Sequence, residues 1–209
     1  MVDGLVGSEM CIRDRIMGQV LTAGGGQNPA RQAAINAGIN ISKPAHIVNQ
    51  VCGSGLRAVI SGYQSIKLGE VKNVISGGQE NMSLAPHSIF YRDNKKISEK
   101  HLIDTMINDG LIDAFNNYHM GVTAENVAKK FNISRVEQDD FALNSQKKTE
   151  TAININRFKE ELIKINQSGI NLEKDEHPRK DLNKSDLGRL KAVFLKNGTV
   201  TPGNSSGIN

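Results

Sequence analysis

A single cysteine lies where an apolar strand is followed by a helix, in the first third of the chain. Residues 47–51 form a β-branched apolar run that predicts a buried strand, and from Ser54 onward apolar residues recur at helical spacing. Cys52 falls in the turn between them. The thiolate is the reactive form of cysteine, and the free N–H groups and dipole of a helix start stabilise it. This position would suit a nucleophilic thiol.

The residues around Cys52 leave a second interpretation open. Gly53 and Gly55 carry no side chain that would keep a substrate from the backbone. A helix terminus contributes only about 0.3–1 kcal/mol at an exposed site, so a base must also act on the thiol. On these residues alone, the favoured interpretation of Cys52 is a small apolar side chain packed at a strand end.

Four separated motifs resemble those of one known family, in that family's order. The pattern Asn49-x-x-Cys52-x-Ser54-Gly55-Leu56-x-Ala58 is similar to the active-site signature of the thiolases. The other three motifs are GGQENMS at 77–83, YHMG at 118–121 and GTVTPGN at 198–204. The YHMG run resembles the short-chain branch that acts on acetyl-CoA and acetoacetyl-CoA. The chain is thus identified as a member of the thiolase family, near its acetyl-CoA acetyltransferases.

The resemblance implies acyl transfer through an acyl-cysteine intermediate. Such enzymes condense two acetyl-CoA molecules to acetoacetyl-CoA and coenzyme A, and catalyse the reverse thiolysis. Cys52 would attack the thioester, and its backbone N–H would help to stabilise the oxyanion. No metal and no cofactor is implied beyond coenzyme A as substrate and product. Alternatives are a 3-ketoacyl-CoA thiolase of fatty-acid breakdown, a ketoacyl synthase, and a non-catalytic acyl-CoA-binding fragment.

The resemblance also assigns coenzyme A contacts to seven residues: Leu111, His119, Met120, Arg179, Leu190, Phe194 and Ser206. Arg179 is expected near the nucleotide phosphates and Phe194 near the adenine or pantetheine. Taken singly, His119 is typical of a core histidine, Arg179 of a solvent-facing loop and Phe194 of a core aromatic. Pro202 departs from the small residue expected there and removes one backbone N–H near the coenzyme.

The expected fold class is α/β. The strand at 47–51, the helix that stops at Gly69 and the strand at 71–75 form a βαβ unit, which predicts parallel neighbouring strands. The resemblance implies a thiolase fold: most of the N-terminal βαβ half at 16–81, an insertion (loop) domain that binds coenzyme A at 82–202, and a return to the core at 203–209. Residues 1–15 resemble a translated library adapter and are left out of the expected fold.

Local signals predict several further elements. Asn28 caps a helix with Pro29 at its first position, and Ser134 with Glu137 forms a capping box. Thr123 is expected to cap a helix that runs to Phe131. Residues 158–165 are expected to form an amphipathic strand.

The family is about twice as long as this chain, and its C-terminal half is expected to be absent here. That half carries the histidine that activates the nucleophile and a second catalytic cysteine, and neither motif has a counterpart in these 209 residues. We therefore expect this fragment alone to be inactive and to expose apolar surface that favours aggregation. The family implies a homotetramer for the full-length protein, with residues 82–100 as a candidate contact loop.

Composition narrows the remaining function classes. With 4% aromatic residues, no tryptophan and a net charge of only +4, nothing indicates a nucleic-acid stacking surface. Cys11 and Cys52 provide neither a disulfide framework nor a metal-binding pair, which favours a reducing, cytoplasmic compartment. No apolar run approaches the roughly 20 residues that a membrane span needs.

Overall fold

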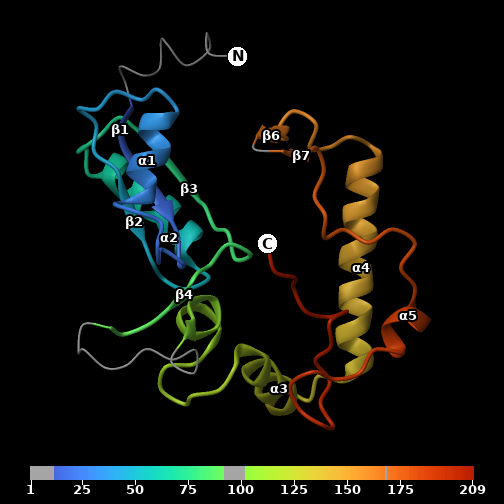
Figure 1. Cartoon of the computed structure of the whole chain (residues 1–209). Helices are drawn as coiled ribbons and strands as arrows, with labels where there is room; N and C mark the ends of the chain where they lie inside the picture. Colours follow the sequence, from blue (N-terminus) through green and yellow to red (C-terminus); the bar gives the residue numbers. More distant parts are fainter. Residues whose placement is uncertain (1–11, 92–101, 168) are drawn as a thin grey trace. The chain divides into compact units, whose positions relative to one another are not determined.

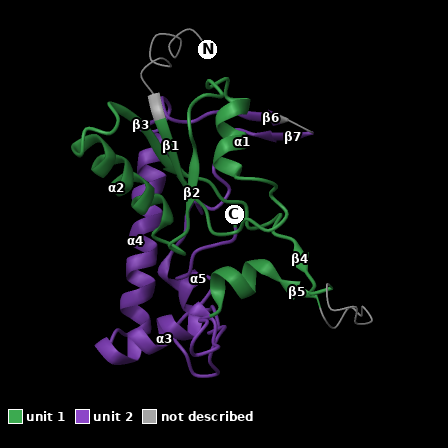
Figure 2. Ribbon diagram, turned by 90° about the vertical axis from the view of Figure 1, so that its left-hand side faces the viewer, with its two compact units in different colours: residues 1–112, 209 green, residues 113–208 purple. Residues whose placement is uncertain are grey.

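The computed structural model describes residues 12–91, 102–167 and 169–209. They divide into two compact units, one of residues 1–112 with 209 and one of residues 113–208 (Figure 2). The domain boundaries expected at residues 82 and 203 remain predictions.

The first unit is built on a three-stranded parallel sheet (Figure 1). Its strands are β1 (Ile12–Gly18), β2 (His46–Val48) and β3 (Asn73–Gly78), in the order β2-β1-β3. The predicted parallel arrangement is confirmed, but the prediction that β2 and β3 are neighbours is wrong, because β1 pairs with both of them. Strand β1, which separates them, begins at Ile12, within the segment 1–15 that was left out of the expected fold.

Residues 12–15 pair with β3 through their backbone, so the fold begins earlier than the expected start at residue 16. Any sequence can supply such backbone pairs, but the side chain of Arg15 fits its surroundings less well. Arg15 is only 2% exposed, and its Nε and Nη2 find no partner among the described residues. Its remaining Nη1 donates to the Pro44 carbonyl at 3.0 Å. Burial, together with the nearby Arg31, lowers the pKa of this guanidinium. Arg15 therefore occupies a position that suits an apolar residue.

Two helices accompany the sheet and begin where the sequence predicts. Helix α1 (Pro29–Asn36) is capped by Asn28, whose side chain accepts from the Arg31 N–H. Helix α2 (Ser54–Lys67) ends before Gly69, which adopts a φ of 75°. A glycine is needed there because side chains disfavour this left-handed conformation.

The inner and outer faces of α2 differ sharply. Its buried residues are small, among them Ala58 and Gly62, and a side chain at Gly62 would collide with Ser76 of β3. The helix therefore packs closely on the sheet. Its outer face carries exposed apolar side chains: Leu56, Val59, Ile60, Tyr63 and Ile66.

The rest of the first unit follows β3. A short antiparallel pair, β4 (His87–Ser88) and β5 (Ile103–Asp104), leads into a π-helical turn, η2 (Ile107–Leu111). Residues 92–100 of the predicted contact loop at 82–100 lie outside the described residues.

The second unit is mainly helical. It contains α3 (Met120–Phe131), α4 (Arg135–Asn154), the hairpin β6 (Ile165–Gln167) and β7 (Ile170–Leu172), and α5 (Lys184–Gly188). The long α4 runs between α3 at its start and the hairpin near its other end (Figure 1).

The local predictions for this unit had mixed outcomes. The capping box of Ser134 and Glu137 at the start of α4 is confirmed. Thr123 was predicted as a cap, but it lies inside α3, because the ring of His119 accepts from the Gly121 N–H and caps the helix instead. The strand predicted at 158–165 is also wrong, since turns continue to residue 161 and β6 begins only at its last residue. Among the described residues, no helix has the length and apolarity needed to cross a membrane.

Candidate active site

The turn between β2 and α2 presents Cys52 to solvent. Strand β2 ends at Val48, earlier than predicted, and residues 49–53 form a tight turn before the helix. The Cys52 side chain is exposed. Its backbone N–H donates to the Gln50 carbonyl at 2.9 Å, so the group expected to bind an oxyanion is already engaged in this structure.

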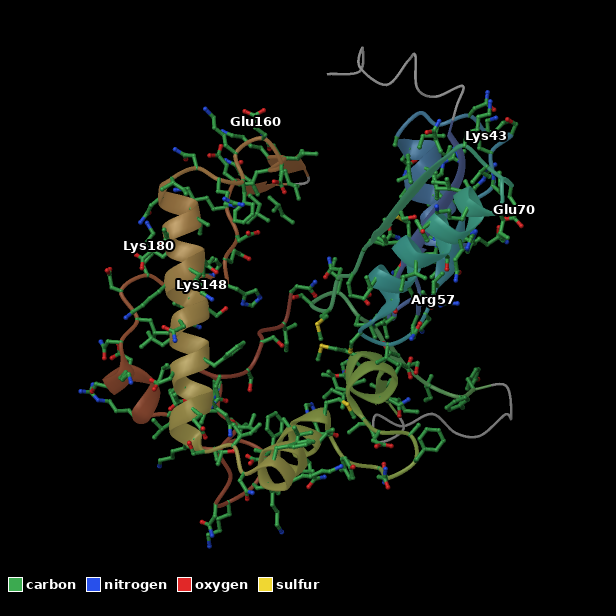
Figure 3. The ribbon with its side chains drawn as sticks, turned by 180° about the vertical axis from the view of Figure 1, so that it is seen from behind. Lys43, Arg57, Glu70, Lys148, Glu160 and Lys180 are labelled. Carbon is green, nitrogen blue, oxygen red and sulfur yellow. The ribbon has the colours of Figure 1, made fainter. Side chains whose placement is uncertain are left out.

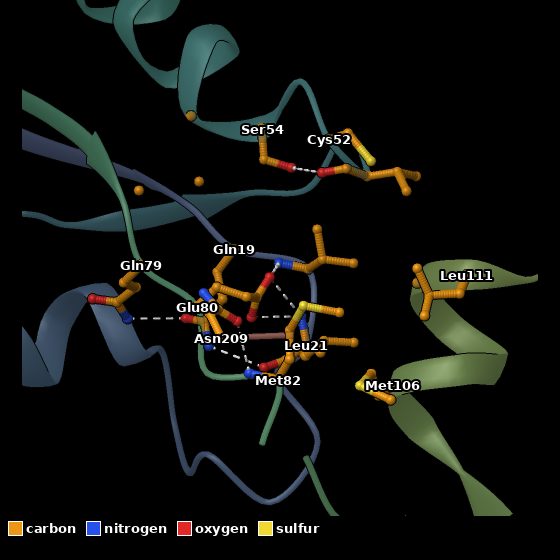
Figure 4. Close-up of a pocket in the computed structure, with 16 residues that line it drawn as sticks. Gln19, Leu21, Cys52, Ser54, Gln79, Glu80, Met82, Met106, Leu111 and Asn209 are labelled. Carbon is orange, nitrogen blue, oxygen red and sulfur yellow. Dashed lines mark hydrogen bonds between the residues drawn. The ribbon is translucent and has the colours of Figure 1, made fainter. Parts of the chain in front are cut away.

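A cavity of about 450 Å³ opens beside Cys52 within the first unit (Figure 4). Its lining is largely apolar, and on the side away from Cys52 it includes Leu21, Met82, Met106 and Leu111. Leu111 is the one predicted coenzyme contact that shares a cavity with the cysteine. The site thus combines a reachable thiol with an apolar space for an uncharged group.

The polar side chains in this cavity bond to one another and to the backbone. Both oxygens of Glu80 accept from the Leu21 N–H, and one of them also accepts from Val20 at 2.9 Å. Gln79 donates to the side chain of Gln19, which in turn donates to the Leu21 carbonyl. These bonds join the segments that follow β1 and β3, and they leave the apolar groups as the available lining.

Glycines allow the three elements of the site to meet. A side chain on Gly18, at the end of β1, would collide with the backbone of Ser54 and Gly55 at the start of α2. The end of β3 approaches the same point, because a side chain on Gly78 would contact Gly18 and Gly55. The carboxyl ends of two parallel strands and a helix start therefore converge, as expected for an α/β site.

The second unit holds the other six predicted coenzyme contacts, and two of these are in contact. The rings of His119 and Phe194 stack with centroids 4.8 Å apart. Gly121 permits this arrangement, because any side chain there would collide with the Phe194 ring. Met120, the first residue of α3, directly follows His119 in the chain and is half-buried.

The structure gives no contact that joins the remaining three residues to this stack. Leu190 follows α5 and lies against Gly203, where a side chain would collide with it. Arg179 is exposed, and its backbone N–H donates to the Gln146 side chain at 2.9 Å. Lys180, the next residue, is also exposed (Figure 3), and so is Ser206. A shared coenzyme site for the six residues remains a prediction.

A buried carboxylate holds the segment that follows Phe194. Glu125 of α3 is 7% exposed, and it accepts from the backbone N–H groups of Thr199 and Val200 at 2.8 Å and from the Thr199 hydroxyl at 2.9 Å. Burial raises the pKa of Glu125, but the bonds from Val200 and Thr199 outweigh it, so the pKa lies below its ordinary value. The ionised form therefore suits this site.

A second carboxylate extends the same network. Asp139 of α4 accepts from Asn204 at 2.9 Å and from the Arg135 Nε at 2.7 Å. Arg135 also donates to the carbonyls of Leu187 and Leu190. Leu190 is thus tied to α4 through its backbone, and the 199–204 segment is tied through its side chains.

Sequence reasoning missed several of these residues. Glu80 stood in a recognised motif, but nothing marked it as the acceptor for Val20 and Leu21. Glu125 gave no local signal, because its partners lie 74 and 75 positions away in the chain. No group of three or more histidine, cysteine or acidic residues in the described part of the chain could hold a metal ion.

Nearly the whole chain is similar to known proteins. A sequence model of the family "Thiolase, N-terminal domain" matches residues 6–209. The acetyl-CoA acetyltransferase of Rhizobium meliloti (strain 1021) is 50% identical over 198 residues, which cover 93% of this chain and 50% of that protein. The acetyl-CoA acetyltransferase of Pseudomonas aeruginosa is 49% identical over 200 residues, 93% of this chain and 51% of its own length.

A solved structure agrees with these matches. The crystal structure of the Bacillus anthracis acetyl-CoA acetyltransferase superposes with a TM-score of 0.88 at 32% identity, covering 99% of this chain and 54% of that one. This chain spans about half the length of the curated relatives. The predicted α/β thiolase fold is confirmed, and the chain belongs to the thiolase family.

Proposed function

We propose that this chain is the N-terminal part of an acetyl-CoA acetyltransferase in which Cys52 receives the acyl group. One observation carries the proposal: Cys52 is exposed in the turn before α2 and borders an apolar cavity. The names of the relatives supply the reaction, which joins two acetyl-CoA molecules or reverses that step. We further propose a cytoplasmic location and a homotetramer for the full-length enzyme, as the family implies.

The first chemical step is a transfer between two thioesters. The Cys52 thiolate attacks the acetyl carbonyl carbon, and a new carbon–sulfur bond forms through a tetrahedral intermediate. The bond from that carbon to the coenzyme sulfur then breaks, and coenzyme A leaves and takes up a proton. The proton lost by Cys52 needs a base, and none of the described side chains is in hydrogen-bonding contact with the Cys52 sulfur. We therefore propose that this chain alone acylates slowly and does not turn over.

The cavity supports the choice of an uncharged acyl group. Its polar side chains Gln19, Gln79 and Glu80 already bond within the protein. Burying a negatively charged group there would place it near the Glu80 carboxylate, with no lysine or arginine in the lining as a partner, which is costly. An acetyl or acetoacetyl group carries no such charge.

Mass spectrometry tests this proposal directly. The chain is incubated with acetyl-CoA, digested and mapped for peptides that carry one added acetyl group. We expect the label on the Cys52 peptide, no label there in Cys52→Ser, and unchanged labelling in Cys11→Ser. A thiolysis assay on the same samples should show no turnover.

Three results would contradict the proposal. Absence of label from Cys52 would remove the nucleophile, and coenzyme A binding without label would favour a non-catalytic acyl-CoA-binding role. Preferential labelling from longer 3-ketoacyl-CoA thioesters would favour the alternative of a fatty-acid thiolase.

A further inference from the structure

The residue before Cys52 has a conformation that its side chain disfavours. Val51 has a φ of 51°, in the left-handed region that β-branched residues rarely occupy. Such strain persists only where surrounding contacts impose it, and it clusters at functional sites. The contacts that hold Val51 therefore also fix the direction in which the chain enters Cys52.

The hydroxyl of Ser54 makes two of these contacts. It donates to the Val51 carbonyl at 2.7 Å and accepts from the Gln50 N–H at 2.8 Å. It thus bonds to the backbone on both sides of the strained φ. Ser54 is 4% exposed, so water does not readily replace these bonds. The Val51 N–H adds a third bond, to the side chain of Asn49 at 3.0 Å.

The same hydroxyl does nothing for its own helix. Ser54 is the first residue of α2, and Gly53 is the N-cap, which makes no side-chain cap bond. A serine that served the helix would stand at the cap and accept from a later N–H. Here the hydroxyl points back to the turn, so its role concerns the turn that carries Cys52.

We propose that Ser54 is a positioning residue for Cys52: its buried hydroxyl holds Val51 in the left-handed conformation that presents the thiol at the start of α2. The proposal rests on the proposed nucleophilic role of Cys52. Without the hydroxyl, Val51 relaxes to an ordinary conformation, and the turn no longer presents Cys52 at the start of α2.

The test compares Ser54→Ala with Ser65→Ala in the full chain. Ser65 lies in the same helix, and its side chain makes no hydrogen bond among the described residues. The alkylation rate of the Cys52 peptide by iodoacetamide is measured across a range of pH, with circular dichroism as a check on folding. We expect Ser54→Ala to slow alkylation at neutral pH about two- to fivefold, the effect of a helix terminus on a nearby anion. Ser65→Ala should match the parent chain.

A second variant separates positioning from general stability. Glycine accepts a positive φ without strain, so in a Val51→Gly background the Ser54→Ala change should slow alkylation less than in the parent. A purely structural loss would be equal in both backgrounds. The φ of residue 51, read from the amide–Hα coupling in NMR spectra, should move out of the left-handed region in Ser54→Ala.

Each outcome bears on one claim. Parental alkylation and an unchanged Val51 φ in Ser54→Ala would overturn the positioning role and leave the nucleophile proposal intact. Because iodoacetamide needs no coenzyme, the positioning role is tested even if acetyl-CoA fails to label Cys52. That failure would overturn the proposed function alone.

Discussion

Two buried charged side chains, one in each unit, have opposite surroundings. Arg15 in β1 has two nitrogens without partners, whereas the carboxylate of Glu125 in α3 accepts from two backbone N–H groups and a hydroxyl. Their exposures are similar, at 2% and 7%. Burial alone therefore does not decide how a charged side chain affects stability. What decides it is whether the surrounding groups replace the lost water.

The largest expected effect is a loss of stability in Glu125→Ala. The substitution leaves the buried N–H groups of Thr199 and Val200 without acceptors, each at about 1–3 kcal/mol. We expect the free energy of unfolding to fall by about 3 kcal/mol, measured by urea denaturation. Glu160→Ala is the matched control at an exposed site (Figure 3) and should change it by less than about 0.5 kcal/mol. Equal effects of the two variants would contradict the comparison.

The opposite sign is expected at Arg15. Arg15→Leu removes a guanidinium with two unpartnered nitrogens and adds apolar burial in the central strand. We expect the free energy of unfolding to rise by about 1–3 kcal/mol, seen as a higher urea midpoint. Arg57→Leu, on the exposed side of α2, is the control and should stay within about 0.5 kcal/mol. A lower midpoint for Arg15→Leu would show that its single bond to Pro44 outweighs the orphaned groups.

Two adjacent aspartates of α4 also differ in the number of groups that they bond to. Asp139 bonds to Asn204 and Arg135, while Asp140 pairs with the exposed Lys184 and with no other described residue. Asp139→Ala should lower the free energy of unfolding by about 1–2 kcal/mol. Asp140→Ala should lower it by about 0–1 kcal/mol, as is usual for an exposed pair. The ranking is checked by thermal and urea unfolding, and a reversed order would refute it.

The smallest expected effect is a pH dependence that originates from Glu125. Its pKa is lowered in the folded state, so the carboxylate contributes stability above the ordinary glutamate value of about 4.3. That contribution is lost as pH falls through the lower folded-state pKa. The difference in free energy of unfolding between the parent and Glu125→Gln should therefore shrink on acidification below about pH 4. A difference that stays constant from neutral to acidic pH would exclude this linkage.

The sequence predicted the elements whose signals are local. The cap at Asn28, the capping box at Ser134 and the helix after Cys52 each depend on residues a few positions apart, and all three are present. Four motifs in order were enough to indicate the family. Local chemistry of this kind is readable because the interacting groups are neighbours in the chain.

The features that the sequence did not indicate depend on residues far apart in the chain or on residue types that are unusual for their role. The position of β1 between the other strands is set by long-range pairing, and part of β1 resembled foreign sequence. Threonine is a common N-cap residue and a histidine ring nitrogen is not, so the residue types alone did not indicate that His119 caps α3. The role of Glu125 required knowledge that residues 199 and 200 fold back onto α3. The positive φ of Val51 contradicts the preference of valine, so no pattern could have indicated it.

The contact of Gly18 with the first turn of α2 also has a dynamic consequence. No side chain separates the two backbones, so no rotamer change between them can compensate for a movement. A displacement of β1 therefore also displaces the turn that carries Cys52. On this side the cavity wall is rigid. Adaptation of the cavity to occupants of different size must therefore come from the opposite wall, where Met82 and Met106 offer flexible, polarizable side chains.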